Sequence, residues 1–440
     1  MMSNPTVHAE VKNVTDSGKG QQGPDGKKGR GNPSENSGKA EIRAQRKLAN
    51  EAERAQRKQD RVAEREARGN ARNAGRKKAP APAFMEPPAE AAEASPAPIA
   101  APAAPVSKPA ARSAVPFNIL IVAQQGRLAA EAVLFAASLR RNAPDWKGRL
   151  IVAEPREAEA WQGTRTQLDD HSRALLTGYG AEVLPFTAQH FGRAYPYGNK
   201  IEALALLPPG QPFVFFDSDT LITGPLDQVG FDFNRPSASM RRSGSWPQPP
   251  LYGPGYTQIW RSLYDRFGLD FDSSLDAGQH DEHWERYLYF NAGWFFGADP
   301  AEFGRRFLDW SLAVRNDPGD ALACQSLDPW LDQIVLPLVI HSLGGGRPGP
   351  ELNGLDGAAS CHYRNLSLLY ARESDAAVAL VEDLLRDPQI APLFAADKAA
   401  QQLVTGGEGR SKVRPMFSDA ANQSEQPIRQ KLKREGFWFR

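Results

Sequence analysis

Two aspartates separated by one residue follow the most apolar strand-like run of the chain. The run is Phe213–Phe216, and Asp217 and Asp219 come directly after it. Ligands of open α/β sheets bind beyond the carboxyl ends of the strands, so both carboxylates would lie where a ligand is expected. Two such oxygens suit a hard divalent cation, which in turn binds phosphate oxygens. The pair is therefore the leading candidate for a metal site.

A second pair of the same kind occurs at Asp270 and Asp272. No apolar run of strand length precedes it, and Gly and Ser residues surround it, as in an ordinary surface turn. The context, and not the spacing of the two aspartates, therefore selects Asp217 and Asp219.

The segments before Asp217 alternate between strand-like and helix-like patterns. Apolar runs of strand length occupy residues 117–123, 150–153, 182–185 and 213–216. Helices are expected at residues 128–140, 166–178 and 199–207. Strands and helices that alternate with short links predict an α/β fold with an open, mostly parallel sheet and flanking helices. The first strand should be buried on both faces, because its apolar run is nearly continuous.

Charge is distributed unevenly along the 440 residues. The whole chain carries 53 Lys and Arg against 52 Asp and Glu, but residues 1–115 carry 21 against 13. The remaining body is therefore acidic, and no specific nucleic-acid partner is expected for it. No stretch of 18 apolar residues occurs, and the first 12 residues lack the apolar core of a signal peptide. These features predict a cytoplasmic protein.

The basic extension divides into three segments by composition. Residues 1–38 are rich in Gly, Ser, Asn and Lys and should be disordered, whereas residues 39–78 predict a charged single helix with pairs such as Glu53 and Arg57. Residues 79–116 form an Ala- and Pro-rich linker. The helix is either a solvated spacer or a contact for an acidic partner, which includes an anionic lipid surface at the inner face of the membrane.

Four motifs in the body resemble those of GT-A-fold nucleotide-sugar glycosyltransferases. The closest pattern is that of the retaining group that includes glycogenin and the bacterial lipopolysaccharide galactosyltransferases. The resemblance covers roughly residues 117–370. It is carried, in chain order, by Lys200-Ile201-Glu202-Ala203-Leu204, by Phe215-Phe216-Asp217-Ser218-Asp219-Thr220, by Tyr289-Phe290-Asn291-Ala292-Gly293-Trp294-Phe295-Phe296, and by Asp332-Gln333.

The resemblance implies a GT-A-type fold and a role for each matched residue. It implies transfer of a sugar from a nucleoside diphosphate-sugar, in particular a UDP-sugar, to a glycan, lipid or protein acceptor with retention of configuration. Mn²⁺ or Mg²⁺ is the implied cofactor, with Asp217, Asp219 and His362 as its ligands. The implied donor-binding residues are Ala123, Gln124, Lys200, Ser218, Ala292 and Gly293. The implied catalytic residues are Asn291, Asp332 and Gln333.

Three of these residues also have a purely structural interpretation. Lys200 could be a solvated helix residue. Gly293 could permit a close strand crossing whether or not a sugar lies beside it. Asp332 could be an ordinary acidic residue at a helix N-terminus, where it interacts favourably with the helix dipole.

The third metal ligand is the point at which the chain departs from the family pattern. The family places its histidine in an H-x-x-G-x-x-K-P-W segment, and no Lys-Pro-Trp occurs in this chain. His341 matches by letter as far as Arg347-Pro348, but it lies near the end of an expected helix. His362 lies at the family's distance along the chain, in a short apolar and aromatic segment. His362 is the favoured ligand, His341 is the second candidate, and a site without either is the third interpretation.

The expected glycosyltransferase-like domain spans residues 117–410. Within it, the aromatic residues of 230–285 suggest an acceptor-side insertion, or else a helical subdomain with its own core. Residues 411–440 form a basic and aromatic tail. Two rival functions remain: a non-catalytic nucleotide- or glycan-binding protein on the same fold, and a sugar-phosphate nucleotidyltransferase. The second would need a Gly-rich basic loop after the first strand, for which Gln124-Gln125-Gly126-Arg127 is a poor match.

Overall fold

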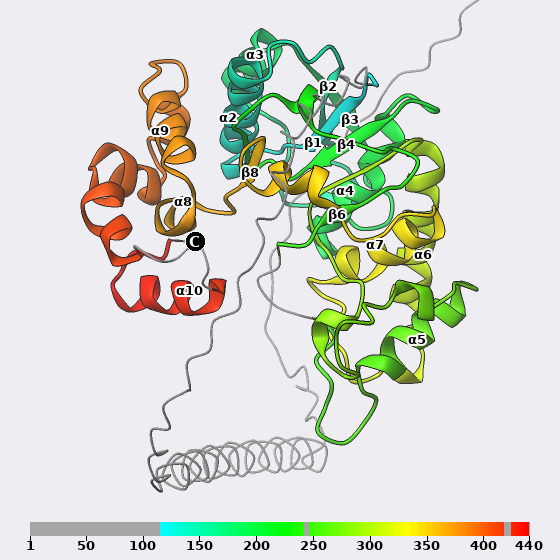
Figure 1. Cartoon of the computed structure of the whole chain (residues 1–440). Coiled ribbons are helices and arrows are strands. Elements are labelled where there is room, and N and C mark those ends of the chain that lie inside the picture. Colours follow the sequence, from blue (N-terminus) through cyan, green and yellow to red (C-terminus); the bar gives the residue numbers. More distant parts are fainter. Residues whose placement is uncertain (1–114, 242–245, 418–423, 440) are drawn as a thin grey trace, which may run out of the picture. The chain divides into compact units, whose positions relative to one another are not determined.

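A six-stranded sheet forms the centre of the body described by the structure, with the strand order β3-β2-β1-β4-β7-β6 (Figure 1). Neighbouring strands from β3 to β4 run parallel, whereas β7 pairs antiparallel with both β4 and β6. The predicted α/β fold with an open, mostly parallel sheet is confirmed. The strands are β1 (Asn118–Val122), β2 (Leu150–Pro155), β3 (Ala181–Phe186), β4 (Phe213–Phe216), β6 (Ala238–Ser239) and β7 (Asn291–Gly297).

The computed structural model describes residues 115–241, 246–417 and 424–439. The disordered segment expected at 1–38, the charged helix expected at 39–78 and nearly all of the linker expected at 79–116 lie outside these ranges. Strand β1 begins at Asn118, just after the expected end of the linker.

Alternation along the strands sends apolar side chains to both faces of the sheet. In β1, Ile119 and Ile121 join the core on one face, whereas Leu120 joins the core on the other. In β4, Val214 and Phe215 separate in the same way. Because both faces of these strands are covered by helices, neither face needs polar side chains, and their sequences are nearly continuous apolar runs.

Helices cover both faces of the sheet (Figure 1). The face that receives Ile119 packs against α2 (Arg127–Asn142) and α3 (Asp170–Gly178). The expected helix at 166–178 begins later, at Asp170, because the side chain of Asp169 caps it by accepting the backbone N–H of Ser172. The other face packs against α4 (Asn199–Glu202), α5 (Tyr256–Arg266), α6 (Pro300–Asn316) and α7 (Leu331–Ser342).

A small second sheet lies beside the central one. Its two strands, β5 (Thr220–Ile222) and β8 (Ser360–His362), run antiparallel, and their register sets Thr220 opposite His362. Because β5 begins directly after Asp219, this pairing brings His362 next to the two aspartates from a distant part of the sequence.

In the described part of the chain after β8, three α-helices extend the core on the α2 face. They are α8 (Leu366–Arg372), α9 (Asp375–Leu384) and α10 (Glu425–Arg434), coloured orange to red in Figure 1. Ile428 and Leu432 of α10 are fully buried in this core, and Trp438 packs against it. The hydrophobic core therefore continues beyond residue 410, the expected end of the domain, and the expected tail at 411–440 contributes to it.

The aromatic segment 230–285 supplies β6 and α5. Within its described part, Trp246, Trp260 and Tyr264 are buried in the core on the α7 face. Tyr252 is an exception, because 92% of its surface is exposed. Most of these large aromatic side chains therefore stabilise the fold, and few of their faces are open to a ligand.

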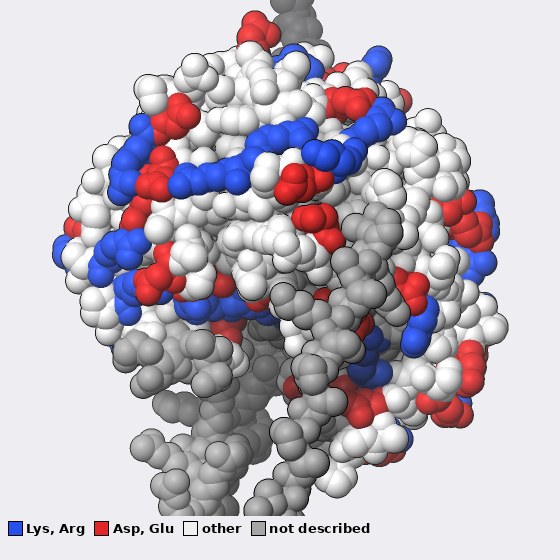
Figure 2. Space-filling view, turned by 45° about the horizontal axis from the view of Figure 1, so that its top comes forward, with Lys and Arg blue, Asp and Glu red and all other residues white. Residues whose placement is uncertain are grey.

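Acidic and basic side chains lie next to one another on the face shown in Figure 2. Several of the molecule's surface charges form ion pairs, such as Arg149 with Glu182 at 2.5 Å and Arg141 with Asp383 at 3.0 Å. Within the described ranges, none of the helices combines the length and the apolar character that crossing a membrane requires.

Candidate active site

A cavity of about 300 Å³ opens at the carboxyl ends of β1 and β4. This is the edge of the sheet where ligands bind in open α/β folds. Its lining includes Gln124 after β1 and Asp217, Ser218 and Asp219 after β4. The other lining residues are Val122, Arg127, Leu128, Pro196, Tyr197, Asn199, Lys200 and Phe215.

Asp217, Asp219 and His362 converge at this cavity. One ligand atom from each lies within 4.8 Å of the others. Nε2 of His362 is 3.0 Å from Oδ1 of Asp219 and 3.8 Å from Oδ2 of Asp217. The backbone supports the arrangement, because the N–H of Tyr363 donates to the carbonyl of Asp219 at 3.1 Å.

The donor set of these three side chains fits a divalent cation. Two carboxylates and one imidazole suit Mn²⁺, and the carboxylates alone suit Mg²⁺. Burial would raise the pKa of Asp219, but the charge and hydrogen bond of His362, together with Arg127 and Lys200, lower it below its usual value. Asp219 is therefore ionised at neutral pH, as a metal ligand must be.

His341, the second candidate ligand, lies elsewhere. Its Nε2 is 3.0 Å from the carbonyl of Asp270 and 3.3 Å from Oγ of Ser273. The second aspartate pair is also separate, because Asp272 is exposed and pairs with Arg261 at 2.8 Å. The tertiary structure thus selects His362 over His341 as the histidine beside Asp217 and Asp219.

Lys200 is buried and joins three elements of the site. Its Nζ lies 2.9 Å from Oδ1 of Asp217 and 3.3 Å from Oδ2 of Asp332, and it donates to the carbonyl of Ala292 at 3.2 Å. Burial alone would lower the pKa of Lys200, but Asp217 and Asp332 raise it above its ordinary value. A solvated helix position is thereby excluded for Lys200, which also lines the cavity.

Asp332 lies at the start of α7, almost fully buried at 1% exposure. The hydroxyl of Tyr195 makes two hydrogen bonds with Asp332. The Tyr195 Oη–H donates to Oδ1 of Asp332 at 2.7 Å, and Oη of Tyr195 accepts the backbone N–H of Asp332 at 2.9 Å. Burial raises the pKa of Asp332, and Lys200 and Tyr195 counteract this only in part. Beside it, Oε1 of Gln333 accepts a hydrogen bond from Tyr289 at 2.8 Å.

Asn291 and Gly293, at the start of β7, have structural partners. Nδ2 of Asn291 donates to the carbonyl of Arg241 at 2.7 Å, and its Oδ1 accepts the N–H of Gly293 at 3.0 Å. The carbonyl of Gly293 accepts the N–H of Asp217 at 2.9 Å, and the ring of His362 packs on the α-carbon of Gly293. Through these contacts Asn291 and Gly293 help to place Asp217 and His362 beside each other.

The predicted donor residues divide into two groups. Gln124, Lys200 and Ser218 line the cavity. Ala123 does not, because strand alternation turns its side chain into the core on the α2 face, where it is fully buried. Ala292 is buried too, and its contact with the site is the carbonyl that accepts from Lys200.

Three lining residues with polar side chains were not predicted from the sequence: Arg127, Tyr197 and Asn199. The side chain of Arg127 is half exposed at the start of α2 and pairs with the buried Glu131 at 2.5 Å. Oδ1 of Asn199 and Oε1 of Gln124 are buried without a hydrogen-bond partner. Such atoms are costly unless a ligand or water satisfies them, so the cavity fits a polar ligand. The sequence feature that could have identified Asn199 as a lining residue is its position directly before Lys200.

The site and the fold agree with the comparison of the sequence with known families. The Rhodobacterales glycosyltransferase domain matches residues 119–344, and the chain belongs to this family. The match runs from the second residue of β1 to just past the end of α7, and it includes every candidate site residue except His362. Sugar transfer is therefore the class of reaction to which the site is assigned.

Several solved structures are similar to the chain at low sequence identity. The galactosyltransferase LgtC, solved in complex with donor and acceptor sugar analogs, is 15% identical over 65% of this chain and 99% of its own, with a TM-score of 0.37. GlyE of Streptococcus pneumoniae TIGR4 is 11% identical over 74% and 65%, with a TM-score of 0.32. Mouse xyloside xylosyltransferase 1 is 11% identical over 53% and 84%, with a TM-score of 0.29. The comparison with curated proteins gave no match.

Proposed function

We propose that this protein transfers a sugar, of hexosyl type, from a nucleoside diphosphate-sugar to an acceptor with the help of a divalent metal ion. The observation that carries the proposal is the convergence of Asp217, Asp219 and His362 at the cavity of a chain that belongs to a glycosyltransferase family. A UDP-sugar is the first donor to test, and the acceptor is a glycan, a lipid or a protein.

Asp217, Asp219 and His362 would hold Mn²⁺ or Mg²⁺. The bound ion would neutralise negative charge that develops on the diphosphate leaving group. Gln124, Asn199 and Ser218 line the same cavity and offer polar atoms to the donor. The orphaned oxygens of Gln124 and Asn199 would accept hydrogen bonds from it.

Lys200 contributes a fixed positive charge under the metal site. Because Asp217 and Asp332 keep it protonated, it lowers the electrostatic cost of a diphosphate in the cavity and stabilises the charge that develops there. It also aligns Asp332, which with Gln333 and Asn291 forms the proposed sugar-facing group.

Retention of configuration is part of the proposal. An inverting enzyme needs a carboxylate that acts as general base on the acceptor. Among the described residues that line the cavity, the carboxylates are Asp217 and Asp219, and both are assigned to the metal. The acceptor is proposed to approach from the side of residues 230–285, since the start of β7 contacts the carbonyl of Arg241 there.

A thermal-shift panel tests the proposal. The chain is heated with each nucleoside diphosphate, with and without Mn²⁺, and the expected result is stabilisation by one nucleotide only when the metal is present. A ligand at 100 times its dissociation constant stabilises the folded state by about 2.7 kcal/mol. Hydrolysis or transfer with the matching sugar nucleotide, followed by NMR of the anomeric proton, then reports turnover and configuration. Tight binding without turnover would instead favour a non-catalytic binding protein.

A further inference from the structure

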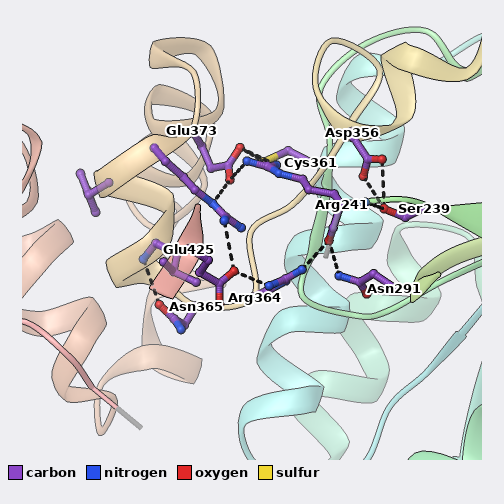
Figure 3. Close-up of polar contacts among 12 residues, drawn as sticks. Ser239, Arg241, Asn291, Asp356, Cys361, Arg364, Asn365, Glu373 and Glu425 are labelled. Carbon is purple, nitrogen blue, oxygen red and sulfur yellow. Dashed lines mark hydrogen bonds and ion pairs between the residues drawn. The ribbon is translucent and has the colours of Figure 1, made fainter. Parts of the chain in front are cut away.

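Two buried glutamates and four arginines link the C-terminal helix to the site (Figure 3). Glu425 is the first residue of α10, and its side chain is 1% exposed. It pairs with Arg364, with Arg372 at 3.1 Å and with Arg429 at 2.6 Å. These contacts join α10 to the segment that follows β8.

Arg364 links Glu425 to strand β7 through the backbone carbonyl of Arg241. Its Nη2 donates to the carbonyl of Arg241 at 2.6 Å, and the same carbonyl accepts Nδ2 of Asn291 at 2.7 Å. Asn291 in turn accepts the N–H of Gly293, on which the ring of His362 packs. Figure 3 shows the contacts from Glu425 through Arg364 and the carbonyl of Arg241 to Asn291. The contacts of Asn291 with Gly293, and of Gly293 with His362, complete the line to the proposed metal ligand.

The second glutamate, Glu373, fixes the side chain of Arg241. It accepts hydrogen bonds from both terminal nitrogens of Arg241, at 2.7 and 3.0 Å, and from Nε of Arg372 at 3.0 Å. Such a two-point pair fixes the guanidinium in orientation as well as position. Because Arg241 is held at its side chain by Glu373, its carbonyl is presented to Arg364 and Asn291 in one place.

The backbone of Arg364 shows how strongly this position is constrained. Its φ is 64°, in the left-handed region that side-chain-bearing residues rarely adopt. A conformation of this kind persists only where the surroundings impose it. Arg364 lies two residues after His362, so the constraint acts directly next to the proposed ligand.

We propose that Glu425 of the C-terminal helix is a positioning residue for the transfer site, acting through Arg364 and Arg241 on Asn291, Gly293 and His362. The inference rests on the proposed function, because it assigns the helix a role in metal binding and turnover. Without Glu425, Arg364 and Arg372 would face one another with like charge, and Arg364 would lose the partner that aims it at the carbonyl of Arg241.

The test compares Glu425→Gln with two controls, one on α10 and one directly after its last residue. Ile428→Val removes one buried methyl group one turn away and lowers stability without touching the ion pairs. Glu435→Gln removes an exposed charge that pairs with Arg434. Mn²⁺ affinity is measured by electron paramagnetic resonance of the free ion, and amide hydrogen exchange is followed at Gly293 and Tyr363.

Glu425→Gln should weaken Mn²⁺ binding by about 10- to 100-fold, as for partners that orient metal ligands. It should lower kcat and speed exchange at Gly293 and Tyr363, whereas both controls leave all three unchanged below their melting temperatures. Unchanged exchange at Gly293, or an equal effect of Ile428→Val, would overturn the inference. If Glu425→Gln does not fold, Arg364→Lys is tested with the same measurements. This variant keeps the positive charge but loses the two guanidinium nitrogens that bond Glu425 and the carbonyl of Arg241.

The two proposals fail in different ways. A wild-type chain that neither binds Mn²⁺ nor transfers sugar contradicts the proposed function, and the claim that Glu425 positions a transfer site falls with it. A wild-type chain that does both, with Glu425→Gln indistinguishable from it, contradicts only the role of Glu425.

Discussion

The imidazole of His362 occupies the space that a side chain at position 293 would need. A Cβ atom built on Gly293 would lie 2.1 Å from Nδ1 and 2.6 Å from Cε1 of His362. Contacts under 3.0 Å force one of the partners to move, and here both atoms belong to a ring that is itself held beside Asp219. Glycine at 293 is therefore required by the histidine, whether or not a sugar also passes near it.

Gly293→Ala should displace His362 and weaken the metal site. We expect the Mn²⁺-dependent rise in melting temperature on nucleotide binding to be lost or strongly reduced, because the third ligand can no longer reach its partners. Gly178→Ala is the matched control, since a Cβ there meets nothing within 4 Å. Differential scanning fluorimetry of both variants checks this, and an unaltered Mn²⁺ response in Gly293→Ala would show that His362 is not needed for it.

Asp219→Asn should abolish Mn²⁺-dependent stabilisation by the nucleotide while the chain stays folded. The substitution removes one charged ligand, and at saturating ligand it should remove up to about 2.7 kcal/mol of ligand-induced stabilisation. Asp272→Asn is the control, because Asp272 belongs to the exposed second aspartate pair. Equal behaviour of the two variants would contradict the assignment of the metal site to Asp219.

Lys200→Met should lower both stability and turnover. Loss of the cation leaves Asp217 and the buried Asp332 without their shared partner, and breaking a buried pair in this way costs about 3–5 kcal/mol. At temperatures where the variant is folded, kcat should fall by about 10²–10³ with little change in acceptor KM, because the charge acts on the departing diphosphate. Steady-state kinetics with the exposed Lys147→Met as control checks this, and an unchanged kcat would limit Lys200 to a structural role.

Glu131→Gln should make the stability of the chain less sensitive to rising pH. Burial raises the pKa of Glu131 well above its usual value, the charge of Asp219 adds to this, and Arg127 opposes it. A carboxyl whose pKa is higher in the folded state favours folding while protonated, and this contribution is lost as the pH rises above its unfolded pKa.

The unfolding free energy of Glu131→Gln, relative to that of wild type, should therefore increase from pH 5 to pH 8. Urea unfolding in EDTA at both pH values measures it, with Glu159→Gln, an exposed glutamate, as the control. A difference that stays constant between the two pH values would mean that Glu131 does not titrate abnormally.

Local patterns in the sequence predicted four strands of the central sheet and the two aspartates of the site. The apolar runs of β1 and β4 predicted strands buried on both faces, and Asp217 and Asp219 follow β4 within three residues, so their place at the sheet edge depends on no distant contact. The alternation of side chains along β1 explains why Ala123 does not line the cavity. Because Val122 and Gln124 face the cavity, the side chain of Ala123 between them must face the core.

The tertiary structure alone decided which distant residues complete the site. The choice between His362 and His341 depends on the register of β5 with β8, and two short strands far apart in sequence carry no local signal for their pairing. The same holds for Lys200, which the sequence placed on a helix but only packing set between Asp217 and Asp332. The burial of Glu425 with Arg364 could not be predicted from the sequence either. A basic and aromatic terminal segment has the composition of an exposed one, and only the packing of Ile428 and Leu432 into the core shows that it is part of the body.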